Sequence, residues 1–124
     1  MNEAEISSWL ELIKHDYETA DLIVRENGHP DIAIYHYHQA TEKYLKVLLL
    51  LKTKQFPKIH YLDKLAAEVI QYYPEIKDII ADILFIDKYL PRLRYPVSDN
   101  FTRDDLLNSQ SKFKNIKVFV EKII

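Results

Sequence analysis

The sequence of 124 residues contains no cysteine and only one glycine, Gly28. Without cysteine the chain has no disulfide framework and no thiol nucleophile. One glycine cannot build a phosphate-cradling loop or a dinucleotide-binding fingerprint, because both need several glycines within a short segment. These absences exclude the ordinary classes of nucleoside triphosphatases and dehydrogenases.

The chain also lacks a long apolar run. The longest, from Val47 to Leu51, is far shorter than the roughly 20 residues that span a bilayer. Near the N-terminus the chain carries Glu3, Glu5 and Glu11, whereas a signal peptide carries positive charge there. We therefore expect a cytoplasmic protein that does not associate with membranes.

Glycine and proline are scarce, while leucine, isoleucine, lysine, glutamate and alanine are abundant, a composition typical of helices. Apolar residues recur three and four positions apart in five segments, which is the pattern of a helix with one buried face. The segments run to about Asn27, from Pro30 to Lys52, from Leu62 to Tyr73, from Glu75 towards Pro91, and from Thr102 onward. The sequence predicts a single all-α domain over residues 1–124, an up-and-down helical bundle of about five helices.

Three details of this bundle can be predicted from single residues. Gly28 follows the first helix, where a residue with positive φ often ends a helix. Thr102 and Asp105 have the spacing of a capping box at the start of the last helix. Leu49 and Leu50 lie outside the core-facing arc of the second helix, which predicts a second apolar surface able to bury a partner subunit.

Positive and negative charges are separated along the chain, although the net charge is only −2. Acidic residues dominate the first 31 positions, and lysines dominate residues 42–64. A second basic cluster without acids contains Lys88, Arg92 and Arg94. Such segregation can make an anion-binding face, although lysines on solvated helix surfaces would give the same pattern.

The second helix carries a polar stripe made of His36, Gln39, Lys43 and Lys46, at spacings of three, four and three residues. An imidazole, an amide and two ammonium groups suit phosphate oxygens and base edges, and a merely solvated face is the alternative. In the first helix, Asp16 falls on the apolar seam, so it should face inward and need a partner. Such a carboxylate marks a constrained position or only fixes the helix register.

The sequence does not predict a metal site or a cofactor. Glu26 and His29 have the spacing of a di-iron half-motif, but the pair spans a helix end and has no second copy. His36 and His38 point roughly 160° apart on a helix, so they are poorly placed to share a metal ion.

Two further segments carry side chains suited to nucleotides. Arg92, Arg94 and Tyr95 lie in an irregular connection, where arginine can clamp phosphate and tyrosine can stack on a base, although packing of a surface loop is the alternative. His60 precedes the third helix and can equally be an ordinary loop or capping histidine. The predicted nucleotide-binding residues are His36, Gln39, Lys43, Lys46, His60, Arg92, Arg94 and Tyr95.

Taken together, these residues resemble the HEPN family of nucleotide-binding domains from higher eukaryotes and prokaryotes. The resemblance rests on Trp9 and Asp16, on the run from His36 to Lys46, on the run from His60 to Leu65, and on Arg94 to Pro96. It implies a helical bundle, commonly a homodimer, that is involved with nucleotides or RNA. It also implies a minimal nucleotidyltransferase as protein partner, in a toxin–antitoxin-like pair.

Ribonuclease members of this wider family use an arginine followed by a histidine after four to six residues. At those positions Arg94 is followed by Asp99, Asn100 and Phe101, so the histidine is missing. We therefore expect a non-catalytic or weakly catalytic nucleotide-binding domain and assign no catalytic residues. The first alternative is a metal-independent ribonuclease, with Arg94 stabilising charge and His60, or else His36, as the base. The second alternative is a non-catalytic helical adaptor.

Overall fold

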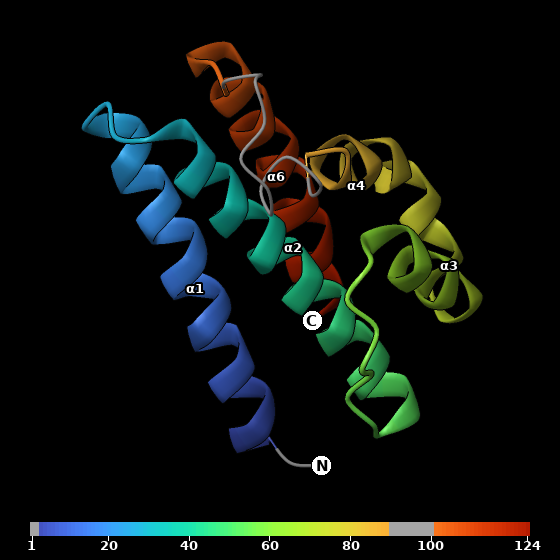
Figure 1. Cartoon of the computed structure of the whole chain (residues 1–124). Helices are drawn as coiled ribbons and strands as arrows, with labels where there is room; N and C mark the ends of the chain where they lie inside the picture. The colour runs from blue at the N-terminus through green and yellow to red at the C-terminus, as the bar shows by residue number, and fades with distance from the viewer. Residues whose placement is uncertain (1–2, 90–100) are drawn as a thin grey trace.

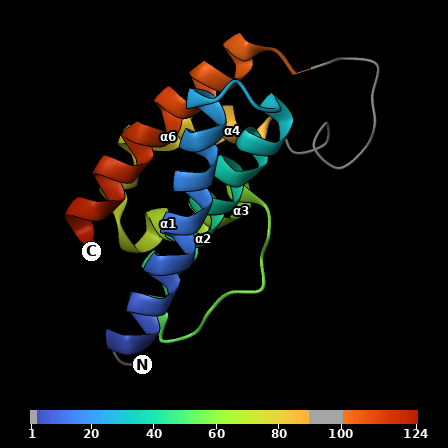
Figure 2. The same cartoon turned by 90° about the vertical axis from the view of Figure 1, so that its left-hand side faces the viewer.

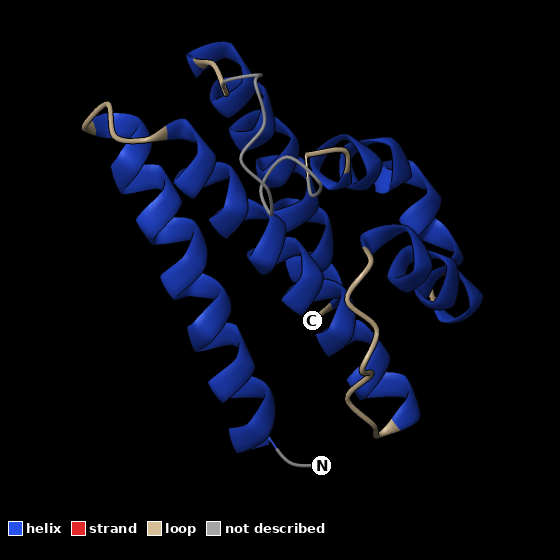
Figure 3. Ribbon diagram, viewed as in Figure 1, coloured by secondary structure: helices blue, strands red, loops and turns tan. Residues whose placement is uncertain are grey.

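The structure is a computed structural model that describes residues 3–89 and 101–124 (Figure 1). Within these ranges every regular element is a helix, and the elements are joined by loops (Figure 3). They are α1 (Glu3–Arg25), α2 (Pro30–Thr53), α3 (Leu62–Tyr72), the 3₁₀ helix η1 (Pro74–Ile79), α4 (Ile80–Asp87) and α6 (Arg103–Ile123). The prediction of an all-α helical bundle is confirmed. None of the described helices is both long and apolar enough to cross a membrane.

Helix α2 is the centre of the bundle, because α1, α3, α4 and α6 all pack against it. Helix α1 runs antiparallel to α2 on one side, and α6 lies on another side (Figures 1 and 2). The backbones of α1 and α6 lie farther from each other than from α2, and these two helices meet through long side chains such as Gln110, which donates a hydrogen bond of 3.1 Å to Asp21. Helix α1 therefore packs mainly against α2, whereas α6 packs against both α2 and α4.

An aromatic cluster fills the centre where α1, α2 and α6 meet. Phe113 of α6 lies with its ring centroid 5.2 Å from that of Tyr37, 5.7 Å from Tyr17 and 6.1 Å from Tyr44. Offset and tilted ring pairs at these distances contribute roughly 0.5 to 1.5 kcal/mol beyond the burial of their surface. The cluster joins the three long helices at mid-length.

The first helix ends differently from the prediction made for Gly28. Asn27, with a φ of 54°, adopts the left-handed conformation, and Gly28 has no positive φ. The Gly28 amide donates a hydrogen bond of 2.9 Å to the Ile23 carbonyl, the six-residue closure of a Schellman motif. Glycine is needed because a Cβ at this position would lie 2.9 Å from Cγ2 of Ile23.

Leu49 and Leu50 do not form a second apolar surface, so this prediction is wrong. Both side chains are buried, at 4% and 1% exposure. The reason is that α2 is covered on several sides, so that the core-facing arc widens at its C-terminal half to include almost every residue. These two leucines therefore give no support to a homodimer, which remains a prediction from the family resemblance.

The second half of the chain largely follows the predicted elements. Residues 74–87 form a 3₁₀ helix followed by α4, where one helix was predicted from Glu75. The capping box of α6 is confirmed, since the Asp105 amide donates to Thr102 Oγ1 at 3.0 Å and the Thr102 amide donates to Asp105 Oδ2 at 2.9 Å. It fixes the start of α6 at the residue that the sequence indicates.

Candidate functional site

The α2 polar stripe, defined as His36, Gln39, Lys43 and Lys46, lies on the side of α2 that borders α1 and the segment between α2 and α3. Its side chains differ in exposure. The side chains of His36 and Lys43 are 28% and 24% exposed, and that of Lys46 only 5%. Gln39 is partly buried. Solvent therefore reaches the first three residues and hardly reaches the fourth.

Asp16 of α1 joins two residues of the stripe. Its Oδ1 lies 2.8 Å from Nδ1 of His36, and its Oδ2 accepts a hydrogen bond of 2.6 Å from Nζ of Lys43. Because an ionised carboxylate only accepts hydrogen bonds, the imidazole must donate from Nδ1. Nε2 of a neutral His36 is then left as an acceptor that faces away from the carboxylate. The sequence prediction of an inward-facing, partnered Asp16 is confirmed.

A second cluster of polar and aromatic side chains surrounds Lys46. Its Nζ lies 3.2 Å from Glu42 Oε2 and 3.2 Å from Nδ1 of His60, and it also lies 5.3 Å from the ring centroid of Phe56. The Phe56 ring in turn stacks on Trp9 at a centroid distance of 4.0 Å and an interplanar angle of 8°. Lys46 is thus enclosed by a carboxylate, an imidazole and an aromatic ring.

These contacts limit the positive charge that the α2 polar stripe offers to a ligand. Each of its two lysines lies beside a carboxylate, Lys43 beside Asp16 and Lys46 beside Glu42. A buried, paired ammonium group cannot bind phosphate unless its present contacts are exchanged. The accessible hydrogen-bonding groups of the stripe are therefore the imidazole of His36, the amide of Gln39 and the partly exposed end of Lys43.

The structure brings some of the predicted site residues together and leaves others outside the described residues. His60 joins Lys46 and Glu42, with its own side chain 63% exposed. Arg92, Arg94 and Tyr95 lie outside the described residues. Two further residues of the site were not singled out from the sequence. Phe56 owes its role to the path of residues 54–61, whereas Glu42 lies four residues before Lys46 on α2, a spacing that does signal an ion pair.

The two histidines of α2 face different partners, as their spacing predicted. His36 meets Asp16 of α1, and Nε2 of His38 lies 3.4 Å from Asp87 of α4. Within residues 3–89 and 101–124, no group of three or more histidine, aspartate or glutamate side chains is placed to hold a metal ion.

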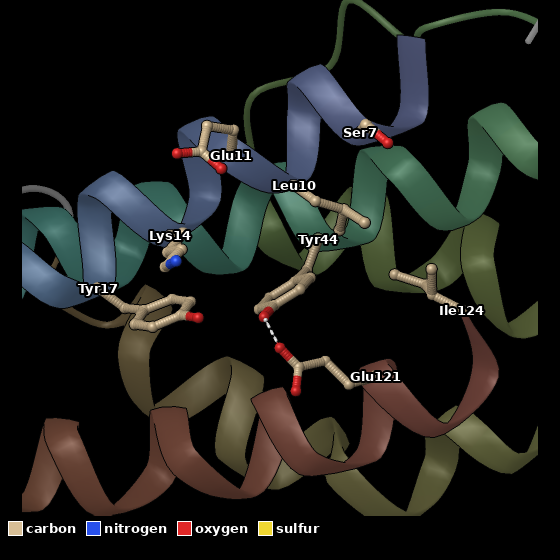
Figure 4. A pocket seen from close by; sticks show the side chains of 8 residues that line it. All are labelled: Ser7, Leu10, Glu11, Lys14, Tyr17, Tyr44, Glu121 and Ile124. Carbon is tan, nitrogen blue, oxygen red and sulfur yellow. Dashed lines mark hydrogen bonds between the residues drawn. The ribbon is translucent and has the colours of Figure 1, made fainter. Parts of the chain in front are cut away.

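An open hollow of about 460 Å³ lies between α1 and α6, and it shares no residue with the α2 polar stripe (Figure 4). Tyr17, Tyr44 and Glu121 face one another across it, flanked by Leu10 and Ile124 (Figure 4). The Tyr44 hydroxyl donates a hydrogen bond of 2.8 Å to Glu121. Burial first, and then this hydrogen bond and the negative charge of Glu121, raise the pKa of Tyr44. The hydroxyl therefore stays protonated and acts as a fixed donor.

A comparison with family models decides the family of the chain. The family model described as HEPN domain matches residues 6–123, which is nearly the whole chain and includes all of its described helices except the first three residues of α1. The chain belongs to the HEPN family. No curated protein and no solved structure matches it.

Membership of the HEPN family bears on the role of the domain that carries the α2 polar stripe. The family supports a nucleotide- or RNA-related role for the domain. Within this HEPN domain the stripe lies on the central helix, and its orientation is fixed by Asp16 of α1. Asp16, one of the residues on which the family resemblance rests, is therefore in direct contact with two residues of the α2 run, His36 and Lys43.

Proposed function

We propose that this HEPN domain binds a nucleotide or RNA and acts with a minimal nucleotidyltransferase as protein partner, in a toxin–antitoxin-like pair. The observation that supports binding is the arrangement of His36, held by Asp16 next to Gln39 on the partly exposed part of the α2 polar stripe. An oriented imidazole loses little freedom when it binds a ligand, so a larger share of each hydrogen bond appears as affinity.

In this proposal His36 and Gln39 contact phosphate oxygens or base edges, and Lys43 supplies charge while it remains close to Asp16. The test is a titration of the protein with a mononucleotide and with a short RNA. We expect His36→Ala and Gln39→Ala each to weaken binding about threefold to tenfold, the effect of one hydrogen bond. Gln71→Ala, which removes an exposed amide from α3, is the matched control and should leave affinity unchanged. Unchanged affinity in the His36 and Gln39 variants would remove this site.

The partner is tested separately from the ligand. If the gene next to this one encodes a small nucleotidyltransferase, the two proteins should co-purify after co-expression. Failure to co-purify would contradict the partnership and leave ligand binding untouched.

A ribonuclease is the second candidate, and the observation that favours it is the contact of His36 with Asp16. A carboxylate that fixes the tautomer of a histidine leaves the second ring nitrogen available as a base. We nevertheless expect little or no cleavage, because the sequence lacks the arginine-plus-histidine motif of the ribonuclease members. The assay is cleavage of single-stranded RNA in EDTA by the wild type and by His36→Ala, His60→Ala and Arg94→Ala. Cleavage that these substitutions abolish would favour the ribonuclease over the binding domain.

A further inference from the structure

In the segment that joins α2 to α3, residues 54–61, Phe56 and Ile59 turn inward and the lysines turn outward. Phe56 and Ile59 are partly buried against the core, and Phe56 is held between Trp9 and Lys46. Lys54, Gln55 and Lys58 are exposed. The segment follows an extended path from the end of α2 to the start of α3 (Figures 1 and 2). Its lysines are therefore carried by backbone that is fixed at several points.

Two neighbouring lysines extend this exposed charge at both ends. The lysine strip is defined as Lys52, Lys54, Lys58 and Lys64, and all four residues are exposed. The ion pairs of lysine among the described residues involve Lys43, Lys46, Lys112 and Lys117, and none of them belongs to the strip.

The surroundings of the lysine strip are aromatic with few acids. Lys52 lies 5.1 Å from the ring centroid of Tyr73, and Lys64 lies 5.0 Å from that of Tyr61. Tyr61 is 48% exposed. Residues 51–73 carry four lysines, all of them in the strip, and only two acids, Asp63 and Glu68. The surface thus combines excess positive charge with an accessible aromatic ring.

We propose that the lysine strip binds the phosphate backbone of single-stranded RNA. This inference rests on the proposed function and deepens it, since it assigns the ligand as an RNA strand and adds a surface outside the α2 polar stripe. Exposed lysines on an extended segment and on the two helix ends beside it suit a linear polyanion, and an exposed tyrosine offers a face on which a base can stack. The paired lysines of the α2 polar stripe lack this free charge.

Binding to a phosphate backbone has a characteristic dependence of the binding constant on salt concentration. For single strands, the logarithm of the binding constant falls with the logarithm of salt concentration with a slope of about −0.7 for each phosphate that is neutralised. Removing two lysines of the strip should therefore make the slope shallower by about 1.4. A loss of hydrogen bonds to a base alone would weaken binding without this change of slope.

The experiment measures the fluorescence anisotropy of a labelled oligouridine of about 12 nucleotides at salt concentrations from about 50 to 200 mM. The strip variant carries Lys54→Ala and Lys58→Ala. The control variant carries Lys114→Ala and Lys122→Ala on α6, which changes the net charge equally at exposed positions. We expect about fivefold weaker binding or more, with the shallower slope, for the strip variant only. Circular dichroism verifies that both variants fold.

The outcomes separate this inference from the proposed function. If both double variants bind oligouridine equally more weakly, the attraction depends on net charge alone and the inference is overturned. A wild type that does not bind oligouridine would also overturn it. If polyglutamate displaces the labelled RNA as effectively as unlabelled oligouridine does, the assignment to RNA is also overturned. A strip variant that loses oligouridine but still binds a mononucleotide supports the inference. Normal oligouridine binding by the strip variant, together with weakened mononucleotide binding by His36→Ala, would sink the inference and leave the proposed site in place.

Discussion

Asp16 is the residue on which the partly exposed half of the α2 polar stripe depends. One carboxylate oxygen orients His36 and the other accepts from Lys43, so a single side chain of α1 fixes two side chains of α2. Asp16 is only 9% exposed. Breaking a buried ion pair is destabilising mainly because the remaining partner is left as an uncompensated charge with little access to water.

Replacing Asp16 by alanine should therefore destabilise the fold and disorder the site. We expect Asp16→Ala to lower the free energy of unfolding by about 1 to 3 kcal/mol, because Lys43 and His36 lose their acceptor. Urea denaturation measures the effect. Glu11→Ala is the control, since Glu11 pairs with His15 at the surface, where both side chains are more than 60% exposed, and it should change stability by about 0.5 kcal/mol or less.

Gly28 is constrained by one neighbour, the side chain of Ile23. We expect Gly28→Ala to cost about 1 to 2 kcal/mol, because the new methyl group would approach Cγ2 of Ile23 to within 2.9 Å. In a variant that already carries Ile23→Ala the same change should cost much less. A double-mutant cycle by urea denaturation gives the coupling. Equal costs in both backgrounds would show that the clash is not the cause.

Among the elements, residues 54–61 hold together parts of the chain that are distant in sequence. Phe56 stacks on Trp9 of α1 and lies against Lys46 of α2, so the connection contacts both helices. We call the contact of Phe56 with Trp9 and Lys46 the clip. Trp9 is the only tryptophan of the chain, and its emission reports on this clip.

Removing the ring of Phe56 should open the clip while leaving the bundle folded. We expect Phe56→Ala to shift the emission maximum of Trp9 to longer wavelength, since the indole loses its stacked partner and meets water. The helical signal in circular dichroism should hardly change. Phe119→Ala on α6, which also removes a partly buried ring, is the control and should leave the emission maximum in place. An unchanged Trp9 spectrum in the Phe56 variant would contradict the stacked arrangement.

The sequence predicts a helix well where apolar periodicity or local capping chemistry marks it, and poorly where its surroundings depend on long-range packing. Apolar periodicity located α1, α2, α3 and α6 because each buries a stripe, and Thr102 with Asp105 marked the start of α6 by local chemistry. The same reasoning failed for Leu49 and Leu50, since periodicity on one helix does not reveal how many neighbours cover it. At the site it identified Asp16 as buried and paired. The partner of Lys43 could not be predicted, because Asp16 reaches it only through the packing of α1 on α2. The pairing of Lys46 with Glu42 could have been predicted, since the two residues are four positions apart on one helix.

At the scale of the whole molecule, buried tyrosines make stability depend on alkaline pH. Tyr37 and Tyr44 are fully buried and donate to Asp21 and Glu121. Burial, followed by these carboxylates, raises both pKa values far above the ordinary 10.0. In the unfolded chain both hydroxyls ionise near pH 10, whereas in the folded chain they stay protonated. The folded state is therefore undisturbed below pH 10 and loses stability as the pH rises above it.

The expected loss is about 1 to 1.5 kcal/mol for each of the two tyrosines between pH values of about 10 and 11. Urea denaturation across this range measures it. Tyr37→Phe and Tyr44→Phe should each reduce the slope of stability against pH, and Tyr35→Phe, which alters a tyrosine that is 44% exposed, should not. A slope that is the same in all three variants would contradict the assignment to the buried hydroxyls.

The central position of α2 has a consequence for synthesis on the ribosome. The residues that cover α2 on its remaining sides belong to α3, α4 and α6, which are all translated after it. At about 5 to 20 residues per second, several seconds pass between the emergence of α2 and that of α6. At the start of this interval α2 is an apolar helix paired only with α1, and the side that α6 covers stays open until the end of the interval, which makes the nascent chain a transient client for chaperones that bind exposed hydrophobic segments.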